Sequence, residues 1–303
     1  MSQPAMSQPA SATLVLQPII EARAVAGYWA GVRRRLWRDK TTVICGSILL
    51  TMFFGILFAG VLAPHDPYHG MILRRLKPIG TSGYWLGTDE LGRDMLTRLL
   101  YGGRLSWFLG ITPVVLATAI GATLGIIAGF ARGGINMAIM RMTDVFYAFP
   151  SVLLAVAISG ALGAGVFNAI LSLTMVFIPP VIRVSESVTT SVRNLDYVES
   201  ARATGAGNWS IVRAQVLPNV LGPIFVYSTS LVGVSMILAA GLSFLGLGTT
   251  PPLAEWGLML NTLRPAIYLQ PVITVLPGCC IFITSFCFNM VSDGLRSAMD
   301  VRG

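Results

Sequence analysis

Long apolar stretches separated by short polar ones occupy most of this chain, and their lengths predict membrane-spanning helices. A helix needs about 20 residues to cross the roughly 30 Å of hydrocarbon in a bilayer. The stretches that come close to this length cover residues 41–62, 105–131, 137–162, 165–182, 220–247 and 271–291. The pattern therefore predicts an all-α polytopic membrane protein with about six transmembrane helices.

A polar segment, residues 196–219, separates the fourth and fifth apolar stretches. Its sequence predicts two short helices joined by a glycine turn. Asp196 and Glu199 have the spacing of a capping box, so Asp196 should cap the first helix. Gly205 and Gly207 favour the left-handed conformation in which many helices end. Two short helices between membrane spans indicate a docking surface rather than a catalytic loop.

The second short helix should begin at Asn208 and end before the fifth span. Trp209, Val212 and Val216 recur at helical spacing. Pro218 should end this helix, because proline has no backbone N–H to donate and its ring clashes with the preceding turn. The fifth span would then start as a separate helix.

The first apolar stretch follows an N-terminal region of different composition. Residues 1–27 carry a tandem MSQPAMSQPA repeat without sustained periodicity, and we expect a flexible cytoplasmic tail there. A basic cluster comes next and consists of Arg33, Arg34, Arg35, Arg38 and Lys40. Lys and Arg favour the cytoplasmic side of a span, so we expect an uncleaved first span and, with six spans, both termini in the cytoplasm. A cleaved signal peptide is the alternative, although its small-residue site would be followed by Pro64.

The polar loop after the first span contains a further candidate helix, GTDELGRDMLTRLLYGGR. Thr88 or Asp89 could cap it, and Gly102-Gly103 should end it. Its apolar side predicts an amphipathic helix that lies in the membrane interface. An extension of the second span is an equal alternative.

A stripe of glycines lies within the second span. Gly121, Gly125 and Gly129 recur every four residues, which lets another helix approach closely. Such stripes occur in membrane proteins of every function, so this one predicts tight packing and no particular activity.

The third span begins with two charged residues. Arg141 and Asp144 are three residues apart and can pair, and Pro150 should kink the helix beyond them. We expect a structural ion pair near the cytoplasmic surface, and a role in gating is the alternative.

Neutral polar residues within the predicted spans could line a water-filled passage. They are Ser151, Ser159, Asn168, Ser228, Ser230 and Asn289. They fit a passage that tolerates varied peptides, but they do not identify a substrate.

Composition supports the membrane assignment and argues against several functions. Hydrophobic residues make up 54% of the chain, charged residues 11%, and the net charge is +8. The basic residues flank apolar stretches instead of forming one surface, so nucleic acid is not an expected partner. The four cysteines lie within apolar stretches as small hydrophobic residues.

The sequence also lacks the motifs of common catalytic sites. Neither lysine belongs to a nucleotide-binding loop, so the chain should not hydrolyse nucleotide itself. His65 and His69 flank Pro67, and we expect ordinary surface residues there; a metal site with Asp66 as the third ligand is the alternative. Since the chain has no catalytic motif of its own, we expect another protein to supply the energy for its function. The polar segment 196–219 is the expected contact site for that protein.

The polar segment resembles the cytoplasmic EAA loop of binding-protein-dependent ABC importer permeases. That loop has the pattern Glu-Ala-Ala, three residues, Gly, nine residues, Ile-x-Leu-Pro. The matching residues are Glu199, Ala201, Gly205, Leu217 and Pro218, while Ser200 and Gln215 depart from the pattern.

Longer motifs narrow the resemblance to one permease type. LGTDELGRDMLTRLLYGGRLS, RMTDVFYAFPSVLLA, LSFLGLGTTPPLAEWG and DGLRSAMD resemble the second permease subunit of dipeptide, oligopeptide and nickel importers. The resemblance extends from about residue 28 to the end of the chain.

The resemblance implies a type I importer fold like that of methionine permeases, in a bacterial inner membrane. Residues 28–104 would form the first span and outer loop, and residues 105–303 the transmembrane core with a cytoplasmic coupling loop at 185–219. Coupling would rest on Asp196, Glu199, Ala201, Gly205, Gly207, Leu217 and Pro218.

The implied partners are a homologous permease, two ATP-binding subunits and an extracytoplasmic binding protein. ATP and Mg would be bound by the ATPases, and this chain would hold no cofactor or metal. Peptide is the expected cargo; nickel or another small solute is the alternative, and a secondary transporter is a further one.

Overall fold

The computed structural model describes residues 28–299, so the expected tail at residues 1–27 and the last residue of the DGLRSAMD motif lie outside it. The described part is helical and contains no β-strand. Its α-helices are α1 (Tyr28–Arg38), α2 (Lys40–Leu57), α3 (Ala59–Leu62), α4 (Met95–Ala131), α5 (Gly133–Tyr147), α6 (Ser151–Leu162), α7 (Val166–Arg193), α8 (Asp196–Ala203), α9 (Asn208–Ile211), α10 (Leu217–Phe244), α11 (Trp256–Leu263) and α12 (Pro271–Met299).

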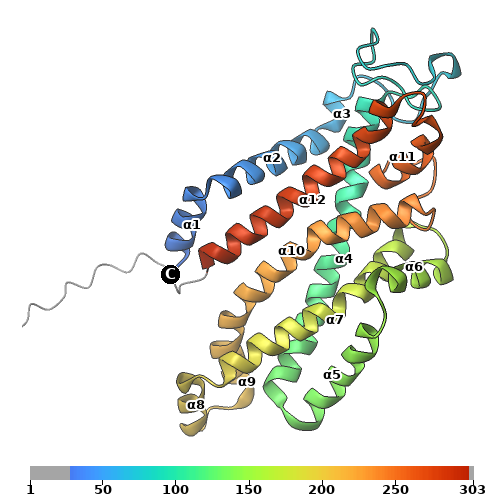
Figure 1. Cartoon of the computed structure of the whole chain (residues 1–303). Coiled ribbons are helices and arrows are strands. Elements are labelled where there is room, and N and C mark those ends of the chain that lie inside the picture. Colours follow the sequence, from blue (N-terminus) through green and yellow to red (C-terminus); the bar gives the residue numbers. More distant parts are fainter. Residues whose placement is uncertain (1–27, 300–303) are drawn as a thin grey trace, which may run out of the picture.

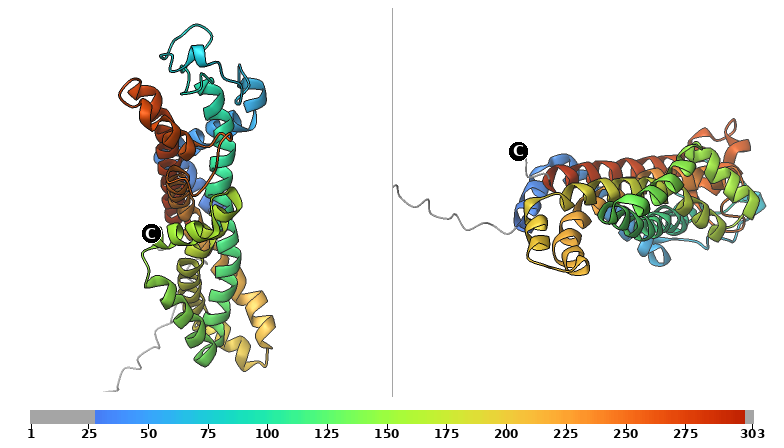
Figure 2. Two further views of the ribbon diagram at one scale, coloured as in Figure 1. Left: turned by 90° about the vertical axis from the view of Figure 1, so that its right-hand side faces the viewer. Right: turned by 90° about the horizontal axis from the view of Figure 1, so that it is seen from below.

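The helices form an elongated bundle with different structures at its two ends (Figure 1). The loop between α3 and α4 lies at one end, together with α11. Helices α8 and α9 lie at the opposite end, and both views in Figure 2 place them outside the body of the bundle.

The described residues include five helices that are long and apolar enough to cross a membrane, or up to six if a bent pair counts as one span. The five are α2, α4, α7, α10 and α12, with α10 continuing α9. The bent pair is α5 and α6, which meet at 85°. Pro150 lies directly before α6, so the predicted kink is confirmed as a complete break in the helix.

Helix α4 is a single helix from Met95 to Ala131, so a separate interfacial helix that ends at Gly102-Gly103 is wrong. The alternative, an extension of the second span, is confirmed. Asp94, and not Thr88 or Asp89, caps the helix by accepting hydrogen bonds from the N–H and the hydroxyl of Thr97. Gly103 serves close packing instead of ending the helix, because a Cβ at this position would lie 2.9 Å from the Trp256 ring.

Buried charges hold the outer loop against the start of α4. Arg98 is 2% exposed; it lies 3.3 Å from Asp89 and donates to the Pro67 carbonyl. Arg93 also contacts Asp89, at 2.6 Å, and pairs with Glu90 at 3.0 Å. Burial raises the pKa of Glu90 above its ordinary value, and the Asp89 carboxylate raises it further.

Candidate functional site

Helix α7 extends to Arg193, so the part of the expected coupling loop (185–219) that lies beyond this span is residues 194–219, called the coupling loop below. It is anchored to the bundle by the apolar side of its helices. Val198 of α8, Ile211 of α9 and Val216 beyond it are each at most 1% exposed and belong to the main hydrophobic core. Since buried apolar contacts of this kind fix the orientation of a helix, α8 and α9 can move together with the bundle as one body.

Arg193 connects the coupling loop to the end of α4. Its guanidinium donates to the Phe130 carbonyl at 3.2 Å and also to the Gly129 carbonyl. The last carbonyls of a helix have no partners within that helix, and a basic side chain there satisfies them. Two parallel spans, α4 and α7, are therefore joined at the point where the loop begins.

Helix α8 ends in a Schellman motif. The N–H of Ala206 donates to the Ala201 carbonyl at 3.1 Å, and the N–H of Gly205 donates to the Arg202 carbonyl at 3.1 Å. Gly205 has a φ of +84°, which a residue with a side chain adopts only at a cost. The predicted helix end at Gly205 is confirmed, whereas Gly207 is extended, with a φ of −65°.

The predicted capping role of Asp196 is wrong. Leu195 is the N-cap of α8, and no side chain caps this end. The connection from α7 takes only two residues and Val198 must face the core, so Asp196 becomes the first residue of the helix. Asp196 and Glu199 instead place negative charge in the first turn, where it stabilises the helix dipole.

Pro218 does not end the second helix, contrary to the prediction. A π-helical segment (Val212–Val216) joins α9 to α10 without interruption, and Pro218 falls in the first turn of α10. Proline has no N–H to donate, and the π-helical turn directly before Pro218 changes the hydrogen-bond pattern there, with the Leu217 N–H donating to the Val212 carbonyl. Gln215 of the EAA-like pattern lies in the π-helical segment, and Leu217 is the first residue of α10.

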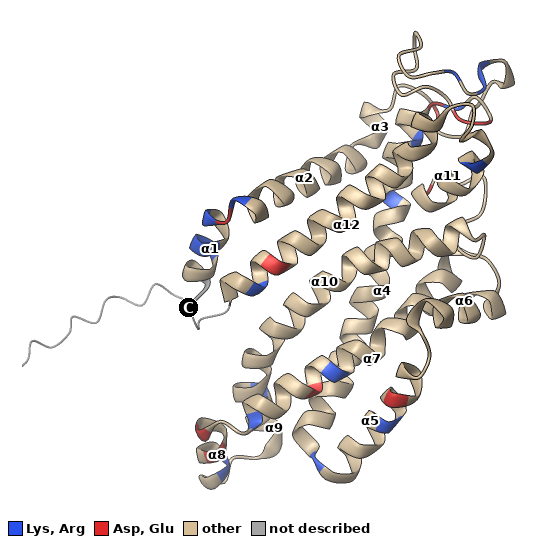
Figure 3. Ribbon diagram, viewed as in Figure 1, with Lys and Arg blue, Asp and Glu red and all other residues tan. Residues whose placement is uncertain are grey.

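Two aromatic side chains project from the coupling loop. Trp209 is 74% exposed and Tyr197 is 43% exposed, on helices whose other sides are buried. Charged residues are sparse along the spans but present on α8 and beside α9 (Figure 3). Exposed aromatic residues within a polar rim are typical of protein–protein interfaces. Sequence analysis placed Trp209 at helical spacing with Val212 and Val216, but it did not show which of these side chains is exposed.

The glycine stripe of α4 packs against α7. A side chain at Gly121, Gly125 or Gly129 would begin 2.8, 2.5 or 2.7 Å from the Cβ of Val181, Ser185 or Thr189 respectively. The prediction of tight packing is confirmed, and the partner is a helix of the same chain.

The expected ion pair is present, but it has a closer partner that sequence analysis missed. Asp144 lies 3.9 Å from Arg141 and accepts a 2.6 Å hydrogen bond from Arg183 of α7. The Arg183 guanidinium also lies over the Tyr147 ring, 4.5 Å from its centroid. The sequence did contain one sign of this partner, because Arg183 directly follows the apolar stretch 165–182.

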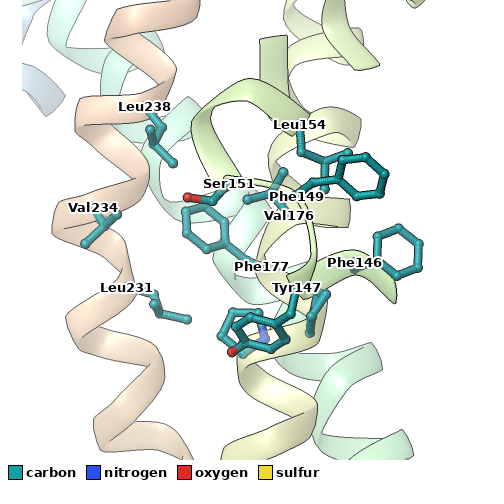
Figure 4. A pocket seen from close by; sticks show the side chains of 12 residues that line it. Phe146, Tyr147, Phe149, Ser151, Leu154, Val176, Phe177, Leu231, Val234 and Leu238 are labelled. Atoms are coloured by element: carbon teal, nitrogen blue, oxygen red, sulfur yellow. The ribbon is translucent and has the colours of Figure 1, made fainter. Parts of the chain in front are cut away.

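A cavity of about 300 Å³ lies at the break between α5 and α6 (Figure 4). Its walls are largely apolar and come from three sides. The α5–α6 break contributes Tyr147 and Ser151, α7 contributes Pro179 and Pro180, and α10 contributes Leu231, Val234 and Leu238, whose side chains point toward the break.

The other predicted pathway residues occupy varied positions. Ser159 is fully buried and donates to the Leu247 carbonyl. Asn168 donates to the carbonyls of Leu162 and Gly163. Ser228 accepts from Thr118, while the side chains of Ser230 and Asn289 each donate to a carbonyl of their own helix. Of the predicted set, Ser151 alone is among the residues that line this cavity.

The fold is that of ABC importer permeases. The chain is similar to the permease chain of the MetNI methionine ABC transporter in inward-facing conformations, with TM-scores of 0.54 and 0.56 in two crystal forms. The match covers 67% of this chain and 97% of the other at 18% identity. The described residues thus have the type I importer fold.

Sequence comparison shows the family. Residues 121–300 match the binding-protein-dependent transport system inner membrane component family, and residues 27–78 match the N-terminal transmembrane domain of oligopeptide transport permease C. The chain belongs to this family of inner membrane components. It is 38% identical to the glutathione transport system permease protein GsiD of Pectobacterium atrosepticum, over 95% of this chain and 96% of the relative. It is 36% identical to GsiD of Escherichia coli O6:K15:H31, over 95% of each.

Proposed function

We propose that this chain forms half of the translocation pathway of an ABC importer for short peptides. Its similarity to glutathione transport permeases over 95% of its length carries the proposal. Glutathione is a tripeptide, so peptides with free carboxylates are the cargo class, and dipeptides and oligopeptides fall within it.

The coupling loop would receive force from two ATP-binding subunits, which bind ATP and Mg. The exposed Trp209 and Tyr197 supply an aromatic contact surface, while Val198 and Ile211 connect α8 and α9 rigidly to the spans. Closure of the ATPases would then move the spans as a rigid body. The chain itself performs no hydrolysis in this scheme.

A homologous permease would complete the pathway beside the cavity face, defined by α5, α6, α7 and α10. Gly121 lies against Val181 and Gly125 against Ser185, so Arg183 lies level with about residue 123 of α4. The α4 helix remains apolar for another eight residues, or about 12 Å at 1.5 Å per residue. Arg183 and Asp144 thus lie at membrane depth, where charges avoid lipid and face water or protein.

The basic cluster before α2 supports a cytoplasmic N-terminus. Since α1, α8 and α9 lie at the end opposite the long loop in Figure 1, the loop would face the extracytoplasmic binding protein. No observation favours nickel as cargo: the His65 ring stacks on Tyr84, and His69 lies beside the exposed Asp66. A secondary transporter has no feature in its support.

Purification of the assembled complex with its binding protein, followed by mass spectrometry of the bound ligand, tests the proposal. A peptide is the expected ligand. A metal ion or a sugar would contradict the peptide assignment.

A further inference from the structure

Arg183 holds an unusual position for a charged residue in a membrane protein. It lies on α7, three and four residues after Pro180 and Pro179, so it shares the side of the helix that lines the cavity. Tyr147 lines the same cavity and stacks against the Arg183 guanidinium. The guanidinium therefore lies at the edge of the cavity, and the Arg183 side chain is 49% exposed.

The charges around Arg183 do not cancel. Asp144 is the carboxylate in contact with both Arg183 and Arg141, so this group of three carries a net positive charge. Glu186, the next acidic residue on α7, is engaged elsewhere and accepts hydrogen bonds from Asn136 and Thr190. Arg183 uses one of its N–H donors on Asp144, and a guanidinium has five.

We infer that Arg183 is a binding site for the carboxylate of the cargo at the inner end of the cavity, an inference that rests on the proposed peptide pathway. A guanidinium matches a carboxylate with two parallel hydrogen bonds. Peptides of every sequence share a terminal carboxylate but differ in their side chains. One fixed cation beside apolar walls therefore suits a pathway that accepts varied peptides.

Asp144 has a defined part in this site. Its 2.6 Å hydrogen bond holds Arg183 against Tyr147 when no cargo is present. An arriving carboxylate competes with Asp144 for the same guanidinium, so the cation is screened between transport events and binding stays weak enough for release. Arg183 thus acts on the cargo, and Asp144 acts through Arg183.

The first test measures the local charge without any cargo. A cysteine placed at Ser151 in the assembled complex is labelled with an anionic and with a cationic methanethiosulfonate reagent, and labelling of the native cysteines is subtracted. Arg183→Gln should lower the anionic-to-cationic rate ratio roughly fourfold, because a unit charge within a Debye length changes each rate by about twofold in opposite directions. Arg183→Lys should preserve the ratio, and Asp144→Asn should raise it. An unchanged ratio in Arg183→Gln would overturn the inference, as would pairing of Arg183 with a carboxylate of the second permease.

The second test separates a cargo site from a structural ion pair. In proteoliposomes with the ATPases and binding protein, Arg183→Gln should reduce glutathione uptake at least about tenfold, the loss expected for one charge-assisted hydrogen bond. The exchange Arg183→Asp with Asp144→Arg should not restore uptake. Recovery by the exchanged pair would show a structural ion pair and refute the inference. Failure of the wild-type complex to transport glutathione would count against the proposed function, while the labelling ratio would still decide the inference.

Discussion

Gly125 of α4 lies so close to Ser185 of α7 that a Cβ on the glycine would be 2.5 Å from the Cβ of the serine. The same Cβ would be 2.6 Å from the Ile182 carbonyl oxygen, which belongs to the rigid helix backbone. Helix α4 is therefore in backbone contact with α7, the span that lines the cavity and leads into the coupling loop. Under the proposed function, such contact would let a displacement of the coupling loop reach the middle of the bundle.

Gly125→Ala should destabilise the protein by about 1–3 kcal/mol, the usual cost of overpacking a close helix contact. Gly160→Ala is the matched control, because nothing lies within 4 Å of a Cβ at Gly160. The measurement is the thermal unfolding midpoint in detergent. Equal midpoints for the two variants would show that α4 and α7 are not in this contact.

Gly205→Val should leave membrane insertion intact but uncouple ATP hydrolysis from uptake. Gly205 has a φ of +84°, and a β-branched residue there costs about 1–3 kcal/mol, which would distort the end of α8. Gly207→Val should have little effect, because Gly207 already has extended backbone that valine favours. The measurement is peptide uptake per ATP hydrolysed. Uptake that is equally efficient in both variants would argue against force transfer through this turn.

Trp209→Ala should weaken binding of the ATPase subunits by about 2 kcal/mol or more, as expected for a tryptophan at the centre of an interface. Folding should be unaffected, since the side chain is 74% exposed. Trp85→Ala is the control, because Trp85 is 75% exposed in the outer loop. The amount of ATPase that co-purifies with each variant reports the result. Full retention of the ATPases by Trp209→Ala would place their contact elsewhere.

The stability of the outer loop should depend on pH through Glu90. Burial raises the pKa of Glu90 in the folded protein, so the folded state holds this proton more tightly than the unfolded state. The contribution of this proton to the free energy of unfolding is complete at low pH and is lost as the pH rises through the raised pKa of Glu90. The unfolding midpoint of Glu90→Gln should therefore exceed that of the wild type by a margin that grows from about pH 4 to pH 7. A margin that is constant with pH would contradict this assignment.

The spans were predictable from sequence because a bilayer imposes a fixed length of apolar residues. The close contact at the glycine stripe was also predictable, because small residues four apart lie on one face of a helix and let another helix approach closely. Its partner, α7, was not predictable, because many helices could fill such a groove. The six-span expectation and the importer fold both agree with the structure.

Local helix ends were predicted less well, because tertiary contacts override local signals. Asp196 is a residue type that favours the N-cap, yet burial of Val198 makes Leu195 the N-cap and Asp196 the first residue of α8. Pro218 would end an isolated helix, yet a π-helical segment places it in the first turn of α10. Arg183 escaped notice because its partners, Asp144 and Tyr147, lie on another helix.

ATP-dependent peptide uptake by the reconstituted complex tests the central claim most directly. Proteoliposomes would contain this chain, its homologous permease, both ATPases and the binding protein, with labelled glutathione outside. We predict uptake that requires ATP inside the vesicles and the binding protein outside. Uptake by this chain without the ATPases, driven by an ion gradient, would contradict the account.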